Sequence, residues 1–343
     1  MTFPEKFSAA SAEYLRRLKM ENLSEKTFRN YENVLKSFGA FCAETEQEDE
    51  FTAVVAWKTA LFERDLSPAT IKQYLVDLEI FFTAAAHRSY PQEYRFGENP
   101  VDKTLLPKIP ARPYPTILTD EQVKLLYRNE APAPRFKPMW AMTWAMLMLL
   151  LNEKLRVSEL TALRLSDLDF HDHILTVVSG KGRKYREVDF TELSELAVEA
   201  YLDSGLRPAA LSDDDFLFGN TAAKVKGQIG NIRGADSWHS FAPTAVSDKV
   251  ERVVAAITGE RKVRAHDLRK IASRVCLNAG QSMEELQGAL GHAQITTTQL
   301  YTSRMGSRKG RDSAKSVLAA RDAAAEQLRQ KNEQEQTVIP LFA

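Results

Sequence analysis

The segment His266-Asp-Leu-Arg-Lys270 combines an imidazole and a guanidinium at a spacing of three residues. Residues at positions i and i+3 share one face of a helix, so both side chains can reach the same ligand. Such a pair can bind one phosphate, with forked hydrogen bonds from the arginine and a hydrogen bond or a proton from the histidine. A single H-x-x-R pattern is common by chance, so its meaning depends on what precedes and follows it.

Two further patterns flank this segment. Leu290-Gly-His292 is followed nine residues later by Tyr301, and Leu155-Arg-Val-Ser-Glu159 lies upstream. A phenol with a pKa of about 10 is a weak nucleophile, so Tyr301 would need a base or a cationic surround to react. Taken alone, Tyr301 could equally be a core or surface residue, and Arg156 and Glu159 could be an ordinary helix start.

Residues 174–178 are rich in β-formers and residues 186–190 alternate in polarity, which predicts a β-hairpin. Its turn contains Ser179-Gly-Lys-Gly182 and carries Lys181. Basic residues gather on the hairpin, around His266 and after Tyr301. Three such clusters in one domain favour phosphate binding over a solvated face. The expected DNA contacts outside the reactive residues are Arg183, Lys184, Arg186 and Lys270.

Apolar periodicity predicts a mostly α protein with a small β-sheet. Helices near residues 7–20, after Ser24, near 52–64 and after Ser67-Pro68 form a small bundle over residues 1–106. Four prolines make residues 107–117 an extended linker. A mixed α+β domain spans residues 118–320. It opens with the capping box of Thr119 and Gln122 and contains helices near 139–151 and 158–165. Residues 203–244 give no clear prediction, and residues 321–343 form a tail.

The composition is that of a globular protein, with 46 basic and 46 acidic residues and no formal net charge. A zero total does not exclude a nucleic-acid partner, because local clusters decide phosphate binding. Two distant cysteines and the lack of a signal peptide or membrane span predict a cytoplasmic protein. His171-Asp-His173 resembles a metal-binding pair, but without a third ligand a solvated turn is favoured.

Taken in order, these patterns resemble the catalytic signature of the tyrosine recombinases, the family of the Cre and Xer recombinases and phage lambda integrase. The resemblance extends over about residues 5–310. Ser24, Tyr31, Phe38 and the segment Leu66-Ser-Pro-Ala-Thr-Ile71 are similar to the family's helical core-binding domain. The resemblance therefore implies a helical core-binding domain followed by a mixed α+β tyrosine-recombinase catalytic domain.

The resemblance also implies residue roles. Arg156 and Arg269 would hold the non-bridging oxygens of the scissile phosphate, and His292 would hydrogen-bond it. Glu159 would support the geometry around Arg156. One departure concerns the turn before Arg156, where many relatives have Thr-Gly and this chain has Glu153-Lys154. Lysine adopts a left-handed backbone less readily than glycine, so the geometry of this turn stays open.

The chemistry that the resemblance implies needs no metal and no cofactor. Lys181 would protonate the departing 5′ oxygen, His266 would assist acid–base transfer, and Tyr301 would attack to form a 3′-phosphotyrosine. This division matches what displacement at a phosphodiester requires. The phosphotyrosine keeps the bond energy, so religation would need no ATP.

The implied partners are double-stranded DNA with short inverted-repeat sites and further copies of the chain in a tetramer, acting through a Holliday junction. Residues 321–343 would dock on the neighbouring protomer, and no arm-binding domain is expected. The target sequence, the accessory proteins and the role in integration, excision or dimer resolution stay open. The alternative classes are a type IB topoisomerase-like enzyme and a non-catalytic DNA-binding protein.

Overall fold

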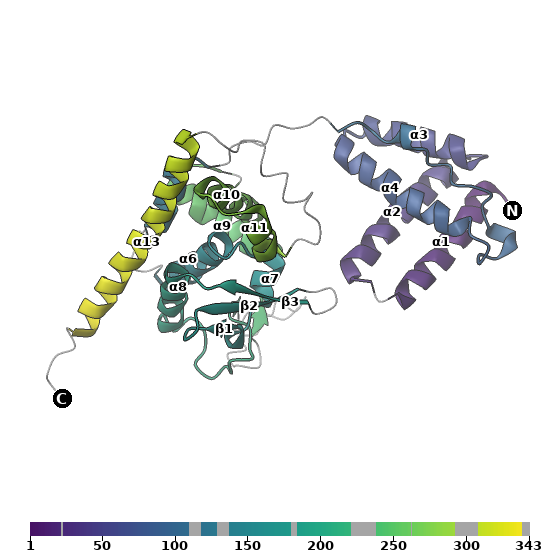
Figure 1. Ribbon diagram of the computed structural model, residues 1–343. Helices are drawn as coiled ribbons and strands as arrows, with labels where there is room; N and C mark the ends of the chain where they lie inside the picture. The colour runs from purple at the N-terminus through teal and green to yellow at the C-terminus, as the bar shows by residue number, and fades with distance from the viewer. Residues whose placement is uncertain are drawn as a thin grey trace. The chain divides into compact units, whose positions relative to one another are not determined.

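The computed structural model describes residues 1–21, 23–109, 118–128, 137–179, 184–220, 238–261, 263–291 and 308–337. For residues 137, 138, 179, 184, 308, 309 and 335–337, it describes the backbone alone. The chain forms two compact units, residues 1–114 and 115–343, each with its own core (Figure 1). The fold is mostly helical with small sheets, as the sequence predicted.

The first unit is a bundle of helices around an aromatic core. Ser24 and Ser67 accept hydrogen bonds from Thr27 N and Thr70 N, so they cap the helices that the sequence placed after them. Phe38 lies edge-on to Trp57 in the fully buried centre. The helices are α1 (Phe3–Met20), α2 (Glu25–Glu44), α3 (Glu50–Glu63) and α4 (Pro68–Ala85), followed by the short 3-10 turns Gln92–Tyr94 and Lys103–Leu105.

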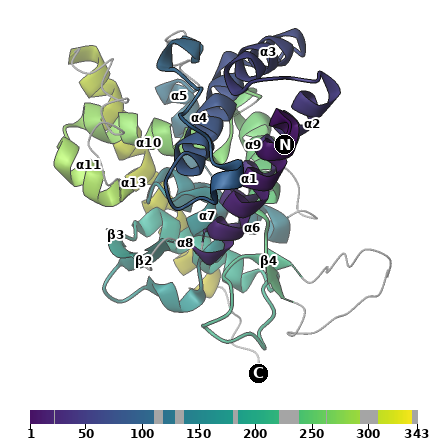
Figure 2. The same ribbon diagram turned by 90° about the vertical axis from the view of Figure 1, so that its right-hand side faces the viewer.

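The second unit is built around one apolar helix, α6 (Lys137–Leu151), which is buried almost throughout from Met142 to Leu151. Helices α8, α9 and α10 pack against it (Figures 1 and 2). The helices of this unit besides α6 are α5 (Asp120–Tyr127), α7 (Val157–Ala162), α8 (Glu192–Asp203), α9 (Pro243–Thr258), α10 (Ala265–Ala279), α11 (Met283–Leu290) and α13 (Arg308–Thr337). The capping box of Thr119 and Gln122 is present at the start of α5.

The predicted hairpin is confirmed as the antiparallel pair β2 (Ile174–Ser179) and β3 (Lys184–Asp189), with Val177 opposite Arg186. The two-residue strand β1 (Leu168–Asp169) extends it to three strands. Successive residues of a strand point to opposite faces. Arg186 and Val188 accordingly face inward, whereas Tyr185 and Glu187 are exposed. The turn at residues 180–183 lies outside the described residues.

The helix expected near residues 158–165 ends earlier, at Ala162. The chain is drawn away because Leu217 N donates to Leu163 O at 2.8 Å and Arg164 forms a β-bridge with Phe216. A 3-10 turn follows at Leu165–Asp167. In the stretch that the sequence left unassigned, strands β4 (Gly219–Asn220) and β5 (His239–Ser240) pair, and residues 221–237 lie outside the described residues.

The C-terminal helix α13 packs on its own unit, against α5, α8 and α10 (Figure 1, yellow). Ala314, Val317 and Ala325 are buried there, and Leu328 packs on the same core. The apolar side of residues 321–328 therefore packs within the chain. Docking of residues 321–343 on a partner protomer stays a prediction, and residues 338–343 lie outside the described residues.

In the His171-Asp-His173 turn, His173 contacts the carboxylate of Glu195. His173 has a φ of 57°, and its Nδ1 lies 2.7 Å from Glu195 Oε1. Over the ranges that the structure describes, no group of three His, Cys, Asp or Glu side chains is arranged to hold a metal ion. None of the helices in those ranges is long and apolar enough to cross a membrane.

Candidate active site

Glu159 lies at the centre of the site because of where α7 begins. Arg156 is the N-cap residue of this helix and Glu159 is the third helical residue, so the carboxylate folds back over the helix start. It accepts hydrogen bonds at 2.7 Å from Arg156 N and from Arg156 Nη1. The predicted support of Arg156 by Glu159 is thus a direct, two-point contact.

Arg186 grips the same carboxylate from strand β3. Its Nη1 donates to Glu159 Oε1 and its Nη2 to Oε2, both at 2.8 Å, and its Nε donates to Ala289 O at 3.0 Å. The side chain is 12% exposed. The sequence had placed Arg186 among the DNA contacts, but its guanidinium is bound to protein groups. The alternation of residues 186–190 was the overlooked signal, since it puts Arg186 on the face of Val188.

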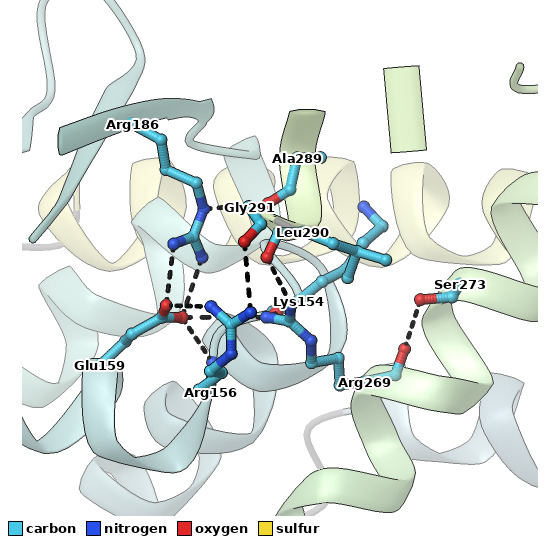
Figure 3. Close-up of polar contacts among 9 residues, drawn as sticks. All are labelled: Lys154, Arg156, Glu159, Arg186, Arg269, Ser273, Ala289, Leu290 and Gly291. Atoms are coloured by element: carbon cyan, nitrogen blue, oxygen red, sulfur yellow. Dashed lines mark hydrogen bonds and ion pairs between the residues drawn. The ribbon is translucent and has the colours of Figure 1, made fainter. Parts of the chain in front are cut away.

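Arg269 enters from α10 and is almost completely buried, with 1% of its side chain exposed. Its Nη1 donates to Lys154 O and its Nη2 to Leu290 O, and Nη1 lies 3.8 Å from Glu159 Oε2. Three guanidinium groups from α7, β3 and α10 therefore converge on one carboxylate (Figure 3).

The charge balance of this cluster favours an anion. Burial alone would raise the pKa of Glu159, but hydrogen bonds and positive charge from Arg186 and Arg156 hold the pKa at about 2. Glu159 is therefore ionised at neutral pH. Three guanidinium charges against one carboxylate leave a local positive excess in a partly dry environment. Such fixed, preorganised charge can stabilise a phosphate that gains negative charge during a reaction.

The turn before Arg156 is left-handed, with φ of 57° at Lys154. Two hydrogen bonds stabilise this turn. Lys154 Nζ donates to Asn152 O at 2.9 Å, and Lys154 O accepts a hydrogen bond from Arg269 Nη1. Lysine thus takes the conformation that glycine adopts more cheaply. The open question about this turn is resolved in favour of a left-handed geometry.

Glu153, the other departure in this turn, is 2% exposed. Its Oε1 accepts from Thr191 N at 3.1 Å and from Thr191 Oγ1 at 2.8 Å, and its Oε2 accepts from Ser194 Oγ at 3.0 Å. Burial raises the pKa of Glu153 to about 7 against the opposing effect of these hydrogen bonds. These contacts anchor the turn to the start of α8, and no local sequence pattern indicates them.

His266 is exposed on the first turn of α10, one turn before Arg269. The pKa of His266 is lowered because neighbouring atoms displace water and because Lys270, Arg269 and Arg156 add positive charge, partly opposed by Asp267. The ring is therefore neutral near pH 7 and able to accept a proton. Lys270 Nζ lies 3.3 Å from Asp267 Oδ1, and its expected phosphate contact stays a prediction.

Four of the predicted site residues, Lys181, Arg183, His292 and Tyr301, lie outside the described residues, and Lys184 is described by its backbone alone. The segment that precedes His292 is described. It ends at Gly291, which has a φ of 60° and whose carbonyl oxygen lies 3.4 Å from Arg156 Nη2. The chain therefore leaves α11 toward residue 292 directly beside Arg156.

Known proteins share this chain's sequence and fold. The model of the phage integrase family matches residues 116–307. Tyrosine recombinase XerC of Oceanobacillus iheyensis is 30% identical over 293 residues, covering 82% of this chain and 87% of that protein. Tyrosine recombinase XerD of Proteus mirabilis is 35% identical over 199 residues, covering 57% of each chain.

Among solved structures, XerH recombinase bound to its difH substrate before cleavage has a TM-score of 0.62 and 18% identity, covering 86% of this chain and 82% of that one. A lambda integrase dimer bound to a core site has a TM-score of 0.61 and 16% identity, covering 87% of this chain and 97% of that one. At these identities the likeness establishes the fold.

The family model and the curated relatives define a recombinase, an enzyme that transfers DNA strands. The chain belongs to the phage integrase family of tyrosine recombinases, as its motifs predicted. Of the three classes that the sequence left open, the relatives support the recombinase over the topoisomerase-like enzyme and the non-catalytic DNA-binding protein.

Proposed function

We propose that this recombinase cuts and rejoins duplex DNA through a 3′-phosphotyrosine on Tyr301, without a metal ion or ATP. The observation that carries the proposal is the convergence of Arg156, Arg186 and Arg269 on Glu159. It supplies the positive charge that a phosphodiester needs at its non-bridging oxygens during displacement.

Within this cluster, Arg156 is the guanidinium that meets the phosphate from solution, because 37% of its side chain is exposed. Arg269, with 1% of its side chain exposed, adds positive charge for the phosphate from within the protein. His292 completes the grip as a hydrogen-bond donor, since it directly follows Gly291, whose carbonyl oxygen accepts a hydrogen bond from Arg156.

The proton transfers balance the bond changes. The phenolic oxygen of Tyr301 bonds to phosphorus, and His266, whose pKa is lowered, is the base within the site for the phenolic proton. The bond from phosphorus to the 5′ oxygen breaks, and Lys181 protonates that oxygen. Religation reverses these steps with a 5′ hydroxyl as the nucleophile, so the phosphotyrosine linkage supplies the energy of the new phosphodiester.

The proposed partner is a duplex with short inverted repeats, cut within a tetramer that passes through a Holliday junction. The similar structures support the DNA partner: XerH is bound to difH, and lambda integrase is bound as a dimer to a core site. The complete exchange reaction would take place in a tetramer and pass through a Holliday junction.

The test is covalent capture. A pool of randomised duplexes, each with a nick that traps the cleaved strand, is incubated with the protein, and DNA that stays attached after denaturation is sequenced. We expect an adduct on a defined inverted-repeat sequence with the wild-type protein. The Tyr301→Phe variant lacks only the phenolic oxygen, so it should bind the captured duplex and form no adduct. An adduct with this variant would overturn the assignment of Tyr301.

A further inference from the structure

Arg186 joins three separate elements of the second unit. It lies on β3, five residues after Lys181, and its guanidinium reaches Glu159 on α7 and Ala289 in the last turn of α11. The two bonds to Glu159 form a parallel fork, which fixes direction as well as distance. The strand after the Lys181 turn is thereby tied to the helix start that holds Arg156 and to the segment that leads to His292 (Figure 3).

The negative charge of Glu159 is shared by two arginines, Arg156 and Arg186. Oε1 accepts from both Arg156 and Arg186, at 2.7 and 2.8 Å. Without Arg186, the carboxylate would be shared with Arg156 alone at close range, and less of the Arg156 charge would act on a phosphate. Arg186 therefore keeps Arg156 electrostatically available as well as correctly placed.

The backbone at Gly291, the last described residue of this segment, also lies against Arg186. Gly291 lies so close that a Cβ atom there would be 3.2 Å from Arg186 Cδ and from Arg186 Nη1. Gly291 also needs a left-handed backbone, with φ of 60°. The Arg186 side chain thus packs under the backbone at Gly291 while its Nε holds the carbonyl of Ala289.

We propose that Arg186 is a positioning residue, which sets Arg156 through Glu159 and ties the Lys181 hairpin to the segment that carries His292. This inference rests on the proposed function, in which Arg156, Lys181 and His292 act on the phosphate. The expected role of Arg186 as a DNA contact is the alternative that the test below decides, and its Nε, Nη1 and Nη2 all donate to protein oxygens.

The test compares Arg186→Met and Arg186→Lys with the wild-type protein on the nicked duplex captured by the wild type. Two quantities are measured: the affinity for the duplex as a function of salt, and the single-turnover rate of adduct formation at saturating protein. For Arg186→Met we expect affinity within about twofold, an unchanged salt slope and a rate lower by on the order of 100-fold, the size of loss that small misplacements cause.

Arg186→Lys keeps the positive charge and most of the stem but cannot form the fork, so it should fold, bind normally and cleave slowly. It decides the question if the Met variant does not fold. Normal cleavage by Arg186→Lys would overturn the proposal. The proposal would also be overturned if the variant lost about 0.9 from the salt dependence of its DNA affinity but formed the adduct at the normal rate once bound. That result would mark Arg186 as a phosphate contact.

Two controls separate this inference from the proposed function. Glu187→Gln alters the neighbouring, exposed residue on the other face of β3 and should leave the rate unchanged. If the wild-type protein itself forms no adduct with any duplex, the proposed function fails. If the wild type forms the adduct and Arg186→Met forms it equally fast, only the role of Arg186 fails.

Discussion

Glu153→Gln should change how the stability of the second unit depends on pH. Glu153 is buried beside Lys154, whose carbonyl oxygen accepts a hydrogen bond from Arg269, and its pKa is about 7 in the folded protein against 4.5 for an unperturbed glutamate. Between these two values the folded protein keeps the proton and the unfolded chain has lost it. Unfolding then releases a proton, so this group lowers the stability as pH rises.

The difference of about 2.5 pKa units corresponds to roughly 3 kcal/mol at 1.4 kcal/mol per unit. This loss is absent below pH 4.5 and complete above pH 7. Glutamine does not titrate, so the free energy of unfolding of Glu153→Gln, relative to wild type, should increase by about 3 kcal/mol from pH 4.5 to pH 8.

The assay is urea denaturation of both proteins at several pH values, followed by tryptophan fluorescence. Trp140, Trp144 and Trp238 belong to the second unit and Trp57 to the first, and because both proteins share Trp57, the difference between their curves reports on the second unit. Glu187→Gln, at an exposed site, is the matched control and should show a constant difference from wild type. If the curves for Glu153→Gln and wild type run parallel across this pH range, Glu153 does not titrate as its burial implies.

Three further outcomes are expected. Lys181→Ala should slow cleavage strongly with little effect on binding, and a substrate with sulfur at the bridging 5′ position should rescue it but not Arg156→Ala; an equal response of both variants would exclude Lys181 as the acid. The logarithm of the binding constant for the captured duplex should fall linearly with the logarithm of the salt concentration, with a slope of about 0.9 for each phosphate contact. An affinity that does not change with salt would contradict a duplex-binding site. Deleting residues 338–343, which leaves the packing of Leu328 intact, should preserve binding to one half-site and reduce cooperative binding to two, measured by gel shift; equal cooperativity would refute docking of the tail on a partner.

The sequence by itself determined the class of fold and the order of its parts. Helix caps such as Ser24, Ser67 and Thr119 were readable because a cap acts on the backbone within three residues of itself. The hairpin was readable because alternation and a glycine-rich turn are local signals. The motif residues from Arg156 to Tyr301 were readable as a set because their order resembles the signature of the tyrosine recombinases, and the family match confirms the class that they indicated.

The tertiary structure decided which side chains meet. Arg186 and Glu159 are 27 residues apart, and Arg269 and Lys154 are 115 apart, so no local pattern could pair them. Burial likewise decided the properties of Glu153, because a carboxylate acquires a pKa of about 7 only when the surrounding helices exclude water. The apolar side of α13 packs on α5, α8 and α10, since an apolar stripe specifies burial but not the surface that buries it.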